Sequence, residues 1–282
     1  MNLFPSNRMA EAVFQFKRNW TNHLELEWLE NLFTESGHKW RDRKLTPGKT
    51  IQLFLLQVLY GNTACNHLRH LSGFSFSAMA YCKARMRIPL NVVESLVNLV
   101  SKRISEKEDE TGLWLGHKVF IGDGTGCSMP DTDELRNHFG QPGNQRKGCG
   151  FPVAQLLILV HAGTGMIKKM LVSPLRTHDM LRAAELHPEL QKGDVLVEDR
   201  GFCSFVHIAL LLQKGIEAVF RVHASLKVDF RQISSKQNGI RVSRVRKLGK
   251  QDQIFIWKNP KNIPPSMSKE ELASLPPTLE VR

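Results

Sequence analysis

The order of strand-like and helix-like segments between residues 118 and 222 constrains the fold of this chain more than any other feature. Three β-rich runs come first, and the second and third can pair as a hairpin across the turn at residues 163–165. A helix over residues 177–193, a fourth strand, a second helix and a fifth strand follow. This pattern predicts an α/β domain built on one mixed sheet.

Right-handed crossovers after such a meander place the fourth strand, residues 194–201, parallel to the first strand, residues 118–126, and beside it. This is the strand order of a ribonuclease-H-like fold. Within the run 118–126 the strand itself is predicted to end at Asp123, where a Gly-rich turn begins, and the fourth ends in charge, at Asp199 and its neighbours. Because the C-terminal ends of parallel neighbours meet at one edge of a sheet, the two aspartates are predicted to converge.

Asp123 and Asp199 are therefore predicted to be catalytic metal ligands. A lone carboxylate at a strand end more often marks where the strand emerges into solvent. Two converging carboxylates would repel each other, however, and hard divalent cations favour the ionised form of both while also accepting phosphate oxygens. The pair indicates phosphoryl transfer with two Mg²⁺ ions, for which Mn²⁺ can substitute.

The N-terminal third reads as helical, and three domains are expected: a helical DNA-binding region at 1–112, the ribonuclease-H-like core at 113–225 and a basic β-rich segment at 226–282. Two short helices meet at a Gly turn, and the second ends in Lys83, Arg85 and Arg87. This is compatible with a helix-turn-helix reader of the major groove, although basic helical hairpins also occur in proteins that never touch DNA. The acidic stretch 105–112 is predicted to be a linker.

The distribution of charge favours a polyanionic partner such as double-stranded DNA. The net charge is +12, and residues 113–220 are neutral, with 11 basic and 11 acidic side chains, so the excess lies in the flanks. Arg146 and Lys147, on a Gly-rich loop, are candidate DNA contacts, although a plain flexible loop would have the same composition. Arg200 either contacts a DNA phosphate or screens its acidic neighbours.

Other polar residues near the predicted site receive structural roles. Glu198 alternates with Asp199, so it should point to the opposite face as a surface ion-pair partner. Asp131 and Asp133 are predicted to cap a helix that starts near residue 134. A zinc site at Cys203 and His207 is rejected, because the chain has no CxxC or HxxxH pair.

The cysteine pattern and hydropathy indicate a soluble cytosolic protein. The five cysteines are odd in number and widely spaced, and the N-terminus shows no signal-peptide pattern, so reduced thiols are expected. The longest apolar run, at 153–160, is far shorter than the roughly 18 to 20 residues of a membrane helix.

Several of these segments also carry a resemblance to a known family. The chain resembles the catalytic core of bacterial DDE transposases of the insertion-sequence-four family in the segments "IGDGTGCSMPDT", "HFGQPGNQRKGCGFPVAQLLILVHAGTG" and "GDVLVEDRGFCSF". The resemblance covers roughly residues 40 to 225. It implies a cut-and-paste transposase that cleaves the ends of its own element and joins them to target DNA with magnesium. It also implies a homodimer in a synaptic complex, at the nucleoid of the bacterial cytoplasm.

The same resemblance implies roles for single residues. Asp123 and Asp199 correspond to the first two acids of the Asp-Asp-Glu triad, and residues 242–260 look like the start of the family's β-rich insertion. The family's Glu helix, with Tyr, Arg, Glu and Lys at helical spacing, is not found. Glu270 and Glu271 are expected to stabilise the first turn of a short helix capped by Ser266 or Ser268.

The chain is therefore expected to be a transposase truncated before its last catalytic helix. A metal-dependent strand-transfer enzyme, a catalytically inactive DNA-binding remnant or inhibitor of the full-length enzyme, and a hydrolytic nuclease on the same fold all stay open.

Overall fold

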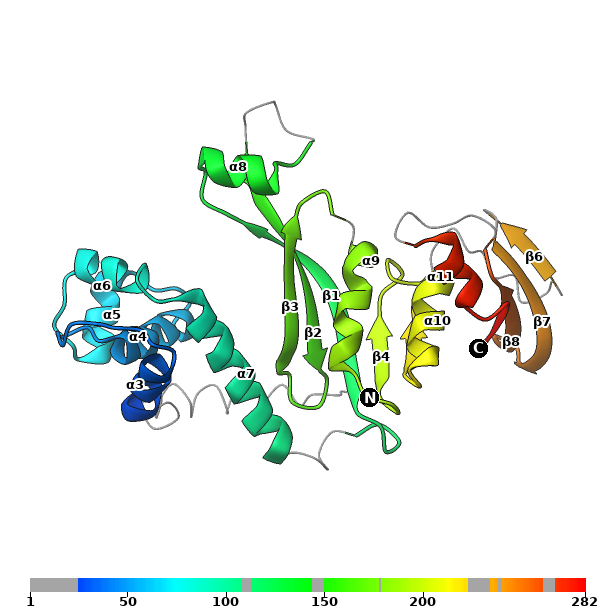
Figure 1. Cartoon of the computed structure of the whole chain (residues 1–282), viewed down its shortest axis with the longest axis horizontal. Helices are drawn as coiled ribbons and strands as arrows, with labels where there is room; N and C mark the ends of the chain where they lie inside the picture. The colour runs from blue at the N-terminus through cyan, green and yellow to red at the C-terminus, as the bar shows by residue number, and fades with distance from the viewer. Residues whose placement is uncertain are drawn as a thin grey trace. The chain divides into compact units, whose positions relative to one another are not determined.

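The computed structural model describes residues 25–107, 113–143, 150–177, 179–222, 234–237, 240–260 and 267–282. The chain divides into two compact units, Met1–Val100 and Ser101–Arg282 (Figure 1). None of the described helices is long and apolar enough to cross a membrane.

The first unit is helical, as predicted. Its helices are α3 (Leu26–Glu35), α4 (Pro47–Leu59), α5 (Cys65–Ser72), α6 (Ala78–Arg85) and the start of α7 (Leu90–Lys107). Thr46 caps α4, where its hydroxyl accepts the Lys49 N–H at 3.3 Å, and Ser77 caps α6. Gly73 ends α5 with a φ of 68°, a backbone conformation that favours glycine. Because α7 continues to Lys107, the predicted start of the linker at residue 105 was too early.

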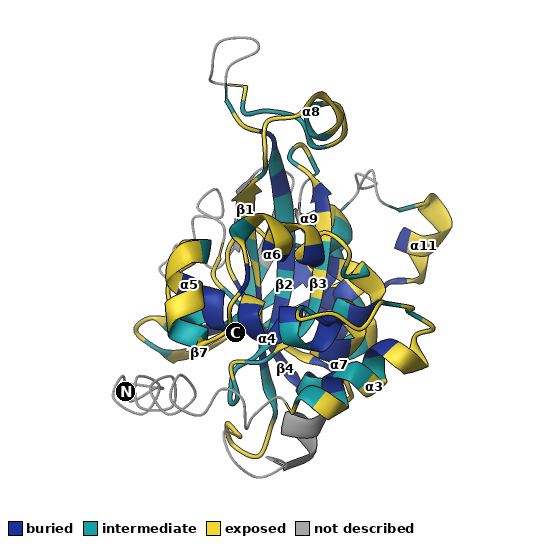
Figure 2. Ribbon diagram, turned by 90° about the vertical axis from the view of Figure 1, so that its left-hand side faces the viewer, coloured by how far each residue is buried: buried dark blue, intermediate teal, exposed yellow. Residues whose placement is uncertain are grey.

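Two apolar clusters hold these helices together, and Figure 2 shows the buried faces of α3 and α4 in dark blue. One joins α3, α4 and α7, and its buried members are Leu29, Phe33, Ile51, Val92 and Leu96. The other joins α4, α5 and α6 through Leu53, Leu56, Leu68, Phe76 and Tyr81. The 3.6-residue period of apolar side chains explains why α3 buries one face, whereas α4, which lies between the two clusters, is buried on successive residues such as Ile51, Gln52 and Leu53.

The second unit is built on a five-stranded mixed sheet with the order β3-β2-β1-β4-β5. Its strands are β1 (Val119–Ser128), β2 (Val153–His161), β3 (Ile167–Pro174), β4 (Val195–Glu198) and β5 (Glu217–Phe220). The first three pair antiparallel, and β4 pairs parallel with both β1 and β5. The predicted position of the fourth strand, parallel to the first and beside it, is confirmed.

Strand β1 is longer than predicted. The sequence suggested that it ends at Asp123, but its ladder with β2 runs from Phe120↔His161 to Ser128↔Val153. Pairing with β2 keeps the Gly-rich run extended, which local turn signals could not reveal. On the other edge of β1, the ladder with β4 ends at Gly122↔Glu198.

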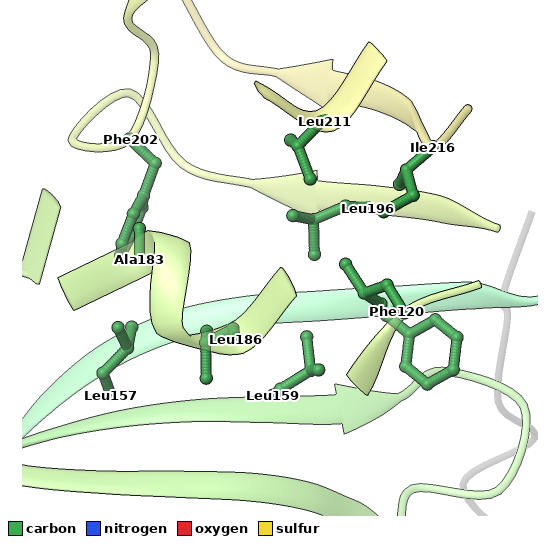
Figure 3. Packing of buried hydrophobic residues seen from close by; sticks show 10 residues of the cluster. Phe120, Leu157, Leu159, Ala183, Leu186, Leu196, Phe202, Leu211 and Ile216 are labelled. Carbon is green, nitrogen blue, oxygen red and sulfur yellow. The ribbon is translucent and has the colours of Figure 1, made fainter. Parts of the chain in front are cut away.

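The described helices between the strands of this sheet and after β4 are α8 (Asp133–Phe139), α9 (Asp179–Arg182) and α10 (Phe205–Gln213), with a 3₁₀ segment, η1 (Ala183–Glu189), after α9. One helix was predicted over 177–193. It divides into a short α turn and η1, and Pro188, which has no N–H to donate, lies inside η1. Figure 3 shows how Ala183 and Leu186 meet the sheet at Leu157, Leu159 and Leu196.

A second, antiparallel sheet has the order β6-β7-β8-β9. Its strands are β6 (Ser234–Gln237), β7 (Ile240–Gly249), β8 (Asp252–Lys258) and β9 (Thr278–Val281). Trp257 of β8 packs edge-on against Phe205 of α10, with ring centroids 6.0 Å apart. Helix α11 (Lys269–Ser274) begins with a capping box between Ser268 and Glu271, which confirms the first-turn role expected of Glu271.

Candidate functional site

Asp123 and Asp199 each directly follow the last ladder pair of the parallel strands β1 and β4. That pair is Gly122↔Glu198; Asp123 continues β1, and Asp199 is the first residue after β4. Both are exposed, whereas Gly122 and Glu198 are buried. Since successive side chains of a strand point to opposite faces, Asp123 lies on the face away from Gly122 and the Glu198 side chain. The ladder therefore places the two residues predicted as metal ligands at the same edge of the sheet.

Backbone amides hold one oxygen of each carboxylate. The Gly124 N–H donates to Asp123 Oδ1 at 2.9 Å, and the Gly201 N–H donates to Asp199 Oδ1 at 2.6 Å. A Cβ at residue 201 would lie 2.9 Å from that same Oδ1, so glycine permits the close approach. Within the described part of the chain, no hydrogen bond takes Oδ2 of either aspartate.

Exposed carboxylate oxygens are the donors that hard divalent cations prefer, so the type of ligand fits magnesium or manganese. The number is two. Among the residues that the structure describes, no group of three or more His, Cys, Asp or Glu could hold a metal ion. Glu217 does not join the pair, because it opposes Val195 at the other end of β4.

Glu198 does not form the predicted surface ion pair. It is 4% exposed, and its Oε2 lies 2.7 Å from Nε2 of His207 on α10. His207 Nδ1 in turn lies 3.2 Å from Nε2 of His187 on η1, and both rings are 3% exposed. Burial lowers the pKa of His187 to about 3, and the charges of His207 and Lys214 add to this effect.

The Glu198–His207–His187 network was missed in the sequence because its members come from three elements. The weak signal available was a histidine within the otherwise apolar run of α10. Gly122 completes the arrangement: a Cβ there would lie 2.5 Å from Glu198 Oε1 and 2.9 Å from its Cγ. Only glycine leaves room on β1 for the buried carboxylate.

The acids after β1 also differ from expectation. Thr132, and not Asp131 or Asp133, caps α8, because its hydroxyl accepts the Leu135 N–H. Asp131 instead binds the Arg136 guanidinium through both oxygens at 2.6 Å. This pairing lowers the pKa of the Asp131 carboxyl.

A pocket of about 900 Å³ in the first unit collects basic side chains. We call it the basic pocket. Lys83 of α6 and Arg87, two residues after the end of this helix, line it. Four cations of the loop before α4, which the sequence did not single out, join them: Lys39, Arg41, Arg43 and Lys44. Its described lining contains no Asp or Glu, and Trp40 and Phe76 contribute apolar surface. Such a hollow suits an anion with a partly apolar body.

The remaining predicted DNA contacts have different surroundings. Arg85 does not line the basic pocket: its guanidinium lies 4.9 Å from the Phe54 ring centroid and donates to Gln57 Oε1 at 3.1 Å. Arg200 is exposed and, in the described part of the chain, forms no ion pair. Arg146 and Lys147 lie outside the described residues.

Comparison with known proteins identifies a family that the sequence matches. The sequence pattern described as transposase DDE domain matches residues 114–275, more than half of the chain. No curated protein has a significantly similar sequence.

Several solved structures are weakly similar to the chain, and three of them show the range. The first is a piggyBac transposase synaptic complex with hairpin DNA, with 10% identity, a TM-score of 0.32, and coverage of 55% of this chain and 35% of that one. The second is a simian T-cell lymphotropic virus intasome in complex with PP2A regulatory subunit B56 gamma. It has 17% identity and a TM-score of 0.25, and the match covers 41% of this chain and 38% of that one. The third is a Mos1 transposase paired-end complex with left transposon end. It has 11% identity and a TM-score of 0.26, and the match covers 64% of this chain and 60% of that one. The chain thus spans less than two thirds of each.

Proposed function

Because the chain belongs to the transposase DDE domain family, we propose that it acts in DNA transposition, as the DNA-binding and metal-holding part of a bacterial insertion-sequence transposase of the insertion-sequence-four group. The reaction is cleavage and strand transfer at the ends of the element, in a synaptic complex of two copies at the bacterial nucleoid. The observation that carries the proposal is that Asp123 and Asp199 each directly follow one residue of the last β1–β4 ladder pair.

In this proposal Asp123 and Asp199 hold magnesium, or manganese in its place. When bound, a pair of such ions activates the attacking hydroxyl or water and stabilises the leaving oxygen. The chain's own contribution is orientation: the Gly124 and Gly201 amides fix one oxygen of each carboxylate. Exposure of both residues leaves room for a phosphodiester, and Arg200, the next residue, can contact its phosphate.

Metal binding tests the first half of the proposal. We expect free Mn²⁺, measured by electron paramagnetic resonance, to fall on titration with the wild-type chain, and the affinity to drop at least tenfold in Asp123→Asn and in Asp199→Asn. Glu134→Gln removes an exposed carboxylate of α8 and serves as the matched control. Equal Mn²⁺ binding by all four proteins would refute the site.

The basic pocket supplies the DNA contact in the first unit. Six cations without a lining carboxylate give a local excess of positive charge, and binding to phosphates releases counterions from the duplex. Arg146 and Lys147, on the Gly-rich loop of the segment that joins β1 to β2, are proposed to add contacts of the same kind.

The salt dependence of duplex binding tests this second half. The double variant Lys83→Gln/Arg87→Gln should weaken binding uniformly across DNA sequences and reduce the slope of log affinity against log salt by about 2. Arg69→Gln, an exposed cation of α5 outside the basic pocket, is the control. An unchanged slope in the double variant would show that DNA binds elsewhere.

A second candidate function is DNA binding without catalysis, as a remnant or an inhibitor of a complete transposase. The observation that favours it is the number of carboxylates: the described residues bring two together, and the resemblance calls for three.

A further inference from the structure

We infer that Glu198 and His207 form a positioning pair that holds Asp199 in place. The inference rests on the proposed function, because it gives Asp199 the role of a metal ligand. Neither Glu198 nor His207 touches the reacting groups in this reading. Their effect passes through the backbone that joins Glu198 to Asp199.

The contact between Glu198 and His207 offsets the cost of removing the Glu198 carboxylate from water. The Glu198 side chain is fully buried, and taking a carboxylate out of water is costly unless hydrogen bonds compensate. Its Oε2 meets His207 Nε2 at 2.7 Å, while its Oε1 has no hydrogen-bond partner among the described residues. One contact therefore fixes the orientation of the Glu198 side chain.

His187 restricts the orientation of the His207 ring. With His207 Nε2 donating to Glu198, the Nδ1 of a neutral His207 ring accepts from Nε2–H of His187 at 3.2 Å. A doubly protonated His207 would donate to both partners instead. In either state the N–H of His207 Nε2 faces Glu198, and His187 lies one hydrogen bond farther from Asp199.

The Glu198–His207 contact connects the two ends of the segment that contains Asp199. Glu198 is the last residue of β4, paired with Gly122 on one side and Phe220 on the other. The turn after it is held by the Gly201 N–H on Asp199 Oδ1 and by the Phe202 N–H on the Asp199 carbonyl at 3.2 Å. His207 lies in the first turn of α10, so its bond to Glu198 joins the two ends of this turn.

Mn²⁺ affinity of folded variants tests the inference. His207→Phe keeps the ring volume and removes the donor, and we expect about tenfold weaker Mn²⁺ binding, the loss typical of residues that orient metal ligands. His207→Gln retains an N–H donor and should restore part of the affinity. His187→Phe makes the same substitution one hydrogen bond farther from Asp199 and should change the affinity less than twofold.

Circular dichroism checks that each variant is folded before titration. If His207→Phe does not fold, His207→Gln against His207→Leu makes the same comparison. Wild-type affinity in His207→Phe, or equal losses in His207→Phe, His207→Gln and His187→Phe, would overturn the inference.

Asp199→Asn separates the two proposals. If it loses Mn²⁺ binding while His207→Phe retains it, only the positioning role fails. If Asp199→Asn binds Mn²⁺ like the wild type, or the wild type does not bind, the metal site fails and the positioning role with it.

Discussion

Among single residues, His187 makes folding depend on pH. Its folded pKa of about 3 lies below the ordinary value of 6.5, so between these two values the unfolded chain binds more protons than the folded chain. The stability that neutral His187 contributes is complete above about pH 6.5 and is lost as the pH falls towards 3. In urea unfolding, the wild type should lose about 2 kcal/mol more than His187→Phe between pH 7 and pH 5. Equal losses in both proteins would contradict a neutral buried ring.

Gly122 should tolerate no side chain. In Gly122→Ala the new Cβ would meet Glu198 Oε1 at 2.5 Å, so the carboxylate must move and its bond to His207 must break. We expect a loss of about 2–3 kcal/mol in unfolding free energy. Gly126→Ala on the same strand is the control: its Cβ would lie 3.3 Å from Cγ1 of Val153, so it should cost less than about 1 kcal/mol. Similar losses in the two variants would contradict the special role of Gly122.

The sequence identified some of the important residues and missed others for a physical reason. Asp123 and Asp199 follow apolar runs, and the strand order alone brings them together. Glu198 was assigned to the surface because a carboxylate is rarely buried. Its burial depends on a histidine nine residues later and on a glycine of another strand, and no local pattern contains both.

Between secondary-structure elements, Gln57 joins α4 to α6 and to the loop after α4. Its Oε1 accepts from the Tyr81 hydroxyl at 2.9 Å and from Arg85, and its Nε2 donates to the Thr63 carbonyl at 2.7 Å. Burial raises the pKa of Tyr81 to about 12.

Gln57→Ala would leave several of these polar groups unpaired, so we expect a loss of about 2–3 kcal/mol, against about 1 kcal/mol for Tyr81→Phe, which removes one bond. Thermal unfolding of the first unit's helices, followed by circular dichroism within the whole chain, measures both. A smaller loss in Gln57→Ala than in Tyr81→Phe would show that Gln57 is not the centre of this contact.

The ends of helices are readable from the sequence where a local signal marks them. Thr46 and Pro47 mark the start of α4, and the Gly turn predicted between two short helices is Gly73, at which α5 ends. The length of β1 and the division of the helix over 177–193 depend on the elements that pack beside them. Local signals therefore predicted a strand that is too short and one unbroken helix.

For the whole molecule, the number of convergent carboxylates sets the expected activity. In the proposed site, Asp123 and Asp199 would hold one cation with water and phosphate, whereas the second cation of a two-ion site would need a further ligand. We expect no cleavage of DNA that carries the sequences flanking the gene, with Mg²⁺ or Mn²⁺, by the wild type, Asp123→Asn or Asp199→Asn. Duplex binding should persist in all three.

Cleavage by the wild type that both substitutions abolish would contradict this expectation and show that a further acid completes the site. That acid could not be named from the sequence, because no segment of it matches the motif that carries the family's third acid. The strand order of the core was predictable, since connection handedness leaves few arrangements.

The unequal pairing of β1 has a consequence for its motions. Strand β2 protects one edge of β1 along its whole length, while β4 covers the other edge only as far as Gly122. Amide hydrogen exchange should therefore be slow over residues 119–122 and faster at every second position of 124–128. The change in local stability falls at Asp123, so brief opening of the strand can shift one carboxylate of the pair while the sheet beneath it stays closed.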